Sequence, residues 1–177
     1  AVVTLDENGQ ANYQFYRAAD RAFDIDKMIL SLPKRLDLYQ IGGFCAIEPN
    51  DAQIWEQVAR SALQKGATLS IDPNIRPSLV NDFAAYKQRL NRFFDLVHLI
   101  KLSVEDLAAL DASLSIKEHV KALLARRNCR LVIVTDGENG SKAFSEQGAA
   151  SAGIYRAATF GDTVGAGDAL MAGVLTI

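Results

Sequence analysis

The sequence lacks the features that mark several large classes of protein. Its 19 lysine and arginine residues are balanced by 21 aspartate and glutamate residues, for a formal net charge of −2, and it contains no basic run. This balance gives no general attraction to nucleic acid or to an acidic membrane. Apolar stretches such as LVIVT (131–135) are far shorter than the ~20 residues of a membrane span, and the opening residues do not show the charged-then-apolar pattern expected of a signal segment. We therefore expect neither a nucleic-acid partner nor a membrane partner.

Cysteine and histidine are scarce as well. Cys45 and Cys129 stand alone, without a CxxC pattern or a neighbouring histidine, on segments expected to be buried. This arrangement favours free thiols in a reducing cytoplasm over a disulfide or a metal site. His98 lies in an apolar run and His119 on an amphipathic helix, and neither has an acidic or cysteine partner at metal-ligand spacing, which favours structural roles.

What the chain does contain is typical of a globular protein. Its 177 residues are 49% hydrophobic and 23% charged, enough to bury a full core in one domain. The chain begins directly in the strand-like AVVTL without a methionine and stops at Ile177 inside an apolar helix. We interpret it as a fragment of a longer protein.

The order of elements predicts an α/β fold. Two β-rich runs, Val2 to Leu5 and Tyr13 to Tyr16, flank a turn signal at 6–9 and predict a hairpin. Strands at 36–41, 67–71, 96–100 and 131–135 then recur about every 30 residues with helical patterns between them, the spacing of βαβ units in a parallel sheet. An antiparallel segment is expected at 141–144.

Local signals indicate where the helices begin. Asn50 or Asp51 is expected to cap the first of them, which Gly66 would end, and Asp82 to open the second. Two S-x-x-acid patterns, Ser103 with Asp106 and Ser115 with Glu118, predict capping boxes at the next two.

Polar and glycine residues gather where the strands end. Ligands of open parallel sheets bind past the carboxyl ends of the strands. The loops expected there are Gly42-Gly43, 72–76, 101–103, 135–137 and the glycine-rich loop at 165–168. The candidate chemistry therefore lies on one rim.

The stretch GDTVGAGDALMAGVLTI (161–177) carries the strongest signal. Gly165 and Gly167 remove side-chain bulk where a loop becomes a helix, so the amides of Gly165, Ala166, Gly167 and Asp168 form an anion site. A carboxylate beside an anion is repelled unless it has a chemical task, and Asp168 is suited to accept the proton of an attacking hydroxyl. This pattern indicates phosphoryl transfer, with simple helix capping by Asp168 as the alternative.

The run DTVGAGDALMAG resembles the C-terminal signature of the ribokinase-type (PfkB) carbohydrate kinases. The matching residues are Asp162, Thr163, Gly165, Ala166, Gly167, Asp168 and Gly173. The resemblance extends through LYQIGGFCAIEP, DPNIRP, KLSVEDL and VTDGENG. DPNIRP resembles a stretch of bacterial fructokinases and ketodeoxygluconate kinases, and KLSVEDL a segment of fructokinases, so the chain is most like a bacterial fructokinase. The resemblance implies a ribokinase-like three-layer α/β/α sandwich with a mostly parallel sheet. Residues 1–17 would be part of a small β lid that covers the sugar and joins a homodimer, and 18–177 the core kinase domain.

The resemblance also implies an activity, the ATP- and Mg²⁺-dependent phosphorylation of a sugar hydroxyl in the cytoplasm with Asp168 as base. Asn74 and Arg76 would lie near the sugar or the transferred phosphate, together with Lys101; the alternative is that Asn74 only stabilises a turn with Arg76 in solvent. Asp136 replaces the family's usual leucine beside Thr135, Gly137 and Gly140, which would meet ATP or are simply turn residues.

Two candidate cation ligands depart from the pattern or stay ambiguous. The acid of the family's N-x-x-E motif falls, by spacing from Lys101, on Val104, so Glu105 is the better Mg²⁺ candidate unless it only opens a helix. Asp162, next to Thr163, fits either a helix cap or a monovalent-cation site for K⁺.

Two other readings stay open. One is a non-catalytic nucleotide-binding relative that acts as a regulatory partner, and the other is a nucleoside or ketodeoxygluconate kinase on the same fold. The sequence does not identify the sugar.

Overall fold

The computed structural model describes residues 2–5, 11–14, 23–155 and 164–176. The chain forms two compact units: Phe23–Ile154 is one, and Ala1–Ala22 with Tyr155–Ile177 is the other. The two units are described separately below.

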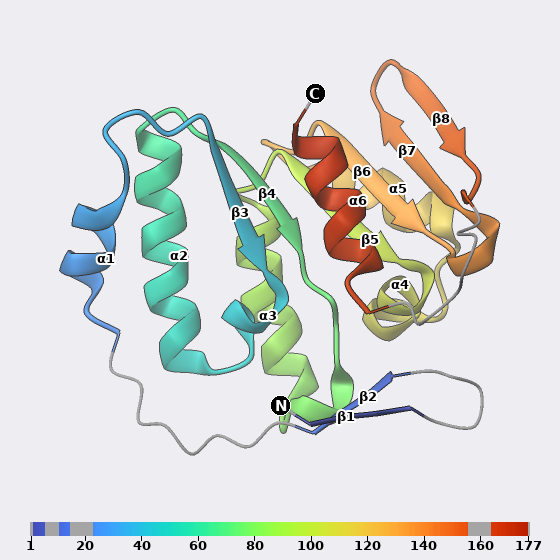
Figure 1. Cartoon of the computed structure of the whole chain (residues 1–177), viewed down its shortest axis with the longest axis horizontal. Coiled ribbons are helices and arrows are strands. Elements are labelled where there is room, and N and C mark those ends of the chain that lie inside the picture. Colours follow the sequence, from blue (N-terminus) through green and yellow to red (C-terminus); the bar gives the residue numbers. More distant parts are fainter. Residues whose placement is uncertain (1, 6–10, 15–22, 156–163, 177) are drawn as a thin grey trace. The chain divides into compact units, whose positions relative to one another are not determined.

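The larger unit is built on a six-stranded sheet in the order β3-β4-β5-β6-β7-β8 (Figure 1). Its strands are β3 Leu38–Gly42, β4 Thr68–Asp72, β5 Leu99–Ser103, β6 Leu131–Thr135, β7 Ser141–Ser145 and β8 Gly148–Ala152. The first four are parallel, and β7 and β8 complete the sheet in antiparallel pairing. This mostly parallel α/β sheet confirms the predicted fold class.

The helices of this unit lie on one face of the sheet, except that the first of them packs beside the second. They are α1 Ile25–Ser31, α2 Pro49–Gln64, α3 Phe83–Phe94, α4 Val104–Asp111 and α5 Ile116–Leu124, with short 3₁₀ turns η1 Gly43–Ala46, η2 Pro77–Leu79 and η3 Gly137–Asn139. Strands β3 to β6 follow one another both in the chain and in the sheet, so right-handed crossovers bring α2 to α5 to the same face. Alternate strand residues, including Ile71, Ile100 and Val132, join the helices in one buried core.

The smaller unit contains the predicted hairpin and the C-terminal helix. Strand β1 (Val2–Leu5) pairs antiparallel with β2 (Ala11–Gln14), in a register that sets Val2 opposite Gln14. The second strand begins two residues before its predicted start, and the predicted turn at 6–9 lies outside the described residues. Helix α6 spans Ala166–Leu175. The assignment of residues 1–17 to a lid that joins two copies stays a prediction.

Most predicted helix boundaries are confirmed by side-chain caps. Asp82 accepts a hydrogen bond from the amide of Ala85 at 2.9 Å, and both predicted capping boxes are formed. Helix α2 differs from the prediction: it begins at Pro49, because proline has no amide hydrogen to satisfy and its fixed φ suits the first helical position.

The boundary of β5 was predicted wrongly. The strand begins at Leu99 and continues to Ser103, so Lys101 and Leu102 lie in the sheet and not in a loop beyond it. Leu96, where the strand was predicted to begin, is an apolar buried residue that instead closes α3. Its amide donates to the carbonyl of Phe93 at 2.9 Å. Helix α1 and strand β8 were not predicted.

Both cysteines are in the state that the sequence predicted. Cys45 and Cys129 are buried free thiols, and burial raises the pKa of Cys45 to about 12. Among the described helices, none has both the length and the apolar character needed to cross a bilayer.

Arg89 braces the turn that follows β3. Its Nε donates to the carbonyl of Ala46 and its Nη2 to that of Ile47, each at 2.8 Å. We expect Arg89→Met to lower the free energy of unfolding by about 1–3 kcal/mol, because two carbonyls lose a charged donor. Arg60→Met is the control: it removes an exposed arginine from Glu56, which keeps its pair with Arg92, and should cost under about 1 kcal/mol in urea titrations. Equal losses of unfolding free energy in the two variants would contradict this role of Arg89.

His98 gives the fold a pH dependence. Its Nδ1 accepts a hydrogen bond from the amide of Leu69 at 3.0 Å, and burial lowers its pKa from the ordinary 6.5. The neutral ring is favoured in the folded state, so its contribution to stability is complete above about pH 6.5 and is lost as the pH falls through the lower folded pKa. His98→Asn keeps an acceptor oxygen but does not titrate. It should therefore reduce the slope of the unfolding free energy against pH between about pH 5 and pH 7, roughly the range in which histidine titrates. An unchanged slope would contradict this role.

Candidate functional site

The carboxyl ends of the parallel strands form the predicted rim within the larger unit. Pairing places Gly42, the last residue of β3, opposite Asp72, the last residue of β4. In the same way it places Ser103, at the end of β5, opposite Thr135, at the end of β6. Residues distant in sequence are thus brought to one edge of the sheet.

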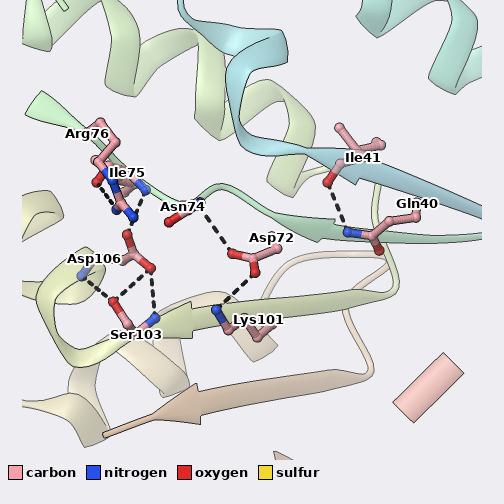
Figure 2. Close-up of polar contacts among 9 residues, drawn as sticks. All are labelled: Gln40, Ile41, Asp72, Asn74, Ile75, Arg76, Lys101, Ser103 and Asp106. Carbon is pink, nitrogen blue, oxygen red and sulfur yellow. Dashed lines mark hydrogen bonds and ion pairs between the residues drawn. The ribbon is translucent and has the colours of Figure 1, made fainter. Parts of the chain in front are cut away.

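A buried ion pair links β4 to β5 just before this edge. Lys101 Nζ lies 2.9 Å from Asp72 Oδ2, and the two side chains are only 8% and 10% exposed (Figure 2). Burial raises the pKa of Asp72, while the hydrogen bond and charge of Lys101 oppose that rise. Removing one partner would leave an uncompensated buried charge. Lys101 was predicted as a substrate ligand in a loop; it is a strand residue paired with Asp72, and the ligand role stays a prediction.

The loop after β4 is held by backbone contacts. The amide of Asn74 donates to Asp72 Oδ1 at 3.2 Å, and the amide of Ile75 donates to Asp106 Oδ1 at 2.7 Å (Figure 2). Asn74 adopts a positive φ of 44°, which asparagine tolerates better than most residues. The side chain of Asn74 is exposed and that of Arg76 half-buried, so both are accessible to a ligand at the rim. Arg76 Nη1 also donates to the carbonyl of Ile75 at 3.0 Å.

Gly43 permits the close approach of two rim segments. A Cβ atom at this position would lie 1.7 Å from the carbonyl oxygen of Pro73, far inside van der Waals contact. Only glycine therefore fits between the turn after β3 and the loop after β4.

The acids at the start of α4 occupy different environments. Asp106 is buried, and its Oδ2 accepts from the amide and hydroxyl of Ser103 at 2.8 and 2.9 Å. Glu105 is exposed in the same turn. Across the described ranges, no three His, Cys, Asp or Glu side chains cluster as metal ligands. The contact of Asp106 with Ile75 was not predicted, because its partner lies 31 residues away in the sequence.

The turn after β6 is held by its own backbone. The amide of Asp136 donates to the carbonyl of Gly140 at 2.9 Å. Gly137 and Gly140 have φ values of 46° and 89°, and a Cβ on Gly140 would lie 2.2 Å from the carbonyl oxygen of Ala152. These glycines are therefore required by the turn itself, and nucleotide contact by them or by Thr135 stays a prediction.

The glycine-rich loop in the smaller unit opens α6. Gly165 is the N-cap, with φ 80° and ψ 0°, a left-handed conformation that favours glycine. The amide of Ala169 donates to the carbonyl of Gly165 at 2.9 Å, so the amides of residues 166–168 precede the first hydrogen bond of the helix. Asp168 is exposed in the first turn and is not the N-cap. Asp162 and Thr163 lie outside the described residues.

Comparison with known proteins supplies the family. The model of the pfkB family carbohydrate kinases matches residues 1–176. The chain belongs to this family. It is 29% identical to fructokinase-2 of Solanum lycopersicum over 178 residues, which cover 99% of this chain and 54% of that protein.

Solved structures place this PfkB-family chain on the ribokinase-like fold. The fructokinase of Xylella fastidiosa with bound ATP has a TM-score of 0.80 at 25% identity. The match covers 98% of this chain and 54% of the chain of that fructokinase. A fructokinase of Vibrio cholerae O395, solved with fructose, ADP and calcium ion, has a TM-score of 0.80 at 21% identity and covers 98% and 56%. The PfkB-family chain thus spans about half the length of the relatives it matches.

The two rim glycines offer a direct test of the site geometry. Gly43→Ala should lower the free energy of unfolding by about 1–3 kcal/mol, because its methyl group must displace the backbone of Pro73. Gly42→Ala is the matched control: no atom lies within 4 Å of its added Cβ and its φ of −88° suits alanine. Its effect should stay within about 0.5 kcal/mol in urea titrations. Similar stabilities of the two variants would contradict the close approach.

Proposed function

We propose that the protein to which this chain belongs is an ATP-dependent sugar kinase, most like a fructokinase. The observation that carries the proposal is the geometry of α6: a glycine N-cap, three amides that precede the first helical hydrogen bond, and Asp168 in the same turn. Membership of a carbohydrate kinase family supports a sugar as acceptor, and the names of the similar proteins favour fructose.

The mechanism is an in-line transfer of the γ-phosphoryl group of ATP to a sugar hydroxyl. Asp168 accepts the proton of the attacking hydroxyl, and the amides of residues 166–168 stabilise the charge that develops on the transferred group. The anion is favoured there because the helix dipole is positive at the N-terminus. Positioning and charge therefore supply most of the catalysis, as is general for phosphoryl transfer.

Mg²⁺ fits this scheme with few protein ligands. The ion is usually bound through one or two carboxylates and the phosphates of the substrate. Glu105, exposed in the first turn of α4, is the carboxylate we assign to it, whereas both oxygens of Asp106 already accept backbone amides. When bound, the ion would neutralise charge on the phosphates. A monovalent ion such as K⁺ at Asp162 belongs to the same proposal.

Substrate binding is assigned to the rim of the larger unit. Asn74 and Arg76 offer an amide and a cation to the sugar or the transferred phosphate, with Thr135, Gly137 and Gly140 on the nucleotide side. Arg76 suits a phosphate because its guanidinium is always charged and presents donors in a planar fork.

The test is ADP release by the full-length protein with Mg-ATP across fructose, ribose, ketodeoxygluconate and a nucleoside. One sugar should be turned over, and Asp168→Asn should bind ATP within a few-fold but lose about 10²- to 10⁴-fold in turnover, the usual contribution of a general base. Asp26→Asn is the control, because Asp26 is likewise an exposed acid in the first turn of a helix.

Each other outcome has a definite meaning. Near-normal turnover by Asp168→Asn would contradict the assignment of Asp168 as the base. Silence on every acceptor despite measurable ATP binding would favour a non-catalytic nucleotide-binding partner. Preference for the nucleoside or ketodeoxygluconate would keep the mechanism and change the substrate.

A further inference from the structure

The described part of the chain contains two capping boxes of the same design in different settings. In one, Glu118 Oε2 accepts from the amide and hydroxyl of Ser115 at 2.7 and 2.6 Å, and the carboxylate is exposed. In the other, Asp106 Oδ2 accepts the same two donors from Ser103, and the carboxylate is 3% exposed. Capping a helix needs only one oxygen and does not need burial.

The second oxygen of Asp106 performs a different task. Oδ1 accepts the amide of Ile75 at 2.7 Å, the shortest of the contacts that hold the loop after β4 (Figure 2). A hydrogen bond to a charged acceptor is shorter and about twice as strong as one between neutral groups. Asp106 thus connects the start of α4 to a loop that belongs to the preceding βαβ unit.

The bond lies between the two side chains assigned to the substrate. Ile75 is 4% exposed, with its side chain in the hydrophobic core, while Asn74 is exposed and Arg76 half-buried. The amide of Asn74 is held by Asp72 and that of Ile75 by Asp106, so two successive backbone groups of the loop are fixed by carboxylates. These two bonds hold the stretch of backbone from which the side chains of Asn74 and Arg76 extend.

We propose that Asp106 is a positioning residue: its carboxylate holds the Ile75 amide and thereby orients Asn74 and Arg76 toward the substrate. The inference rests on the proposed function insofar as Asn74 and Arg76 bind substrate. The hydrogen bond itself is independent of any activity, so the two parts are tested separately.

The first test is amide hydrogen exchange at Ile75 in the full-length protein. In the wild type this amide should be protected, and Asp106→Ala should raise its exchange rate at least about tenfold. Ser103→Ala removes the hydroxyl from the same capping box but leaves the Ile75 bond, so Ile75 should stay protected. Fast exchange in the wild type, or equal effects of Asp106→Ala and Ser103→Ala, would overturn the proposal.

A conservative variant covers the case in which Asp106→Ala fails to fold. Asp106→Asn keeps the volume and one acceptor oxygen, so Ile75 should remain protected even though the capping box is weakened. Exchange at Ile75 as fast as in a denatured control would overturn the proposal. This measurement needs no substrate, and it remains decisive if the protein phosphorylates no sugar.

The second test is a double-mutant cycle on the sugar kinase reaction. Asp106→Ala should lower kcat/KM by about 10- to 100-fold through misplaced substrate contacts, and in an Arg76→Ala background it should add little further loss. Glu118→Ala, which removes the matched carboxylate from the exposed capping box, should leave kcat and KM unchanged. Additive losses from Asp106→Ala and Arg76→Ala would overturn the positioning role, and absence of all turnover would instead contradict the proposed function.

Discussion

The candidate site in the larger unit depends on the ion pair between Lys101 and Asp72. A lone ammonium in a buried strand would be costly to desolvate, and the carboxylate 2.9 Å away makes its burial tolerable. Strand β5 can therefore run through Lys101 to Ser103. Because Ser103 is both the last residue of β5 and the N-cap of α4, the place where that helix begins follows from the same pairing.

Buried and exposed polar groups at the rim have different tasks. Asp72 and Asp106 are buried, and their oxygens accept backbone amides of the loop between them. Asn74 and Glu105 are exposed at the same edge. The buried acids determine the shape of the loop, and the exposed groups are those that a ligand can reach.

The sequence predicted those features that depend on neighbours in the chain. The caps formed by Asp82, Ser103 and Ser115 require partners within three residues, and they were confirmed. The start of β5 was wrong because buried apolar residues such as Leu96 also occur where a helix closes. Strand β8, Gly148–Ala152, contains only glycine, alanine and serine and forms by pairing with β7, so its own residues carry no strand signal. The Asp72–Lys101 and Asp106–Ile75 contacts span 29 and 31 residues and have no local pattern.

The same distinction separates the two halves of the proposed chemistry. Gly165 and Asp168 lie three residues apart at the start of one helix, so their spacing follows from helix geometry and needs no support from the sheet. The positions of Asn74 and Arg76 instead depend in part on long-range contacts, those of Asp106 with Ile75 and of Gly43 with Pro73. The spacing of Gly165 and Asp168 could therefore be predicted from the sequence, whereas the arrangement of Asn74 and Arg76 is a property of the tertiary structure. Changes in the buried acids Asp72 and Asp106 are accordingly expected to act on the loop after β4 and to leave the local geometry at the start of α6 intact.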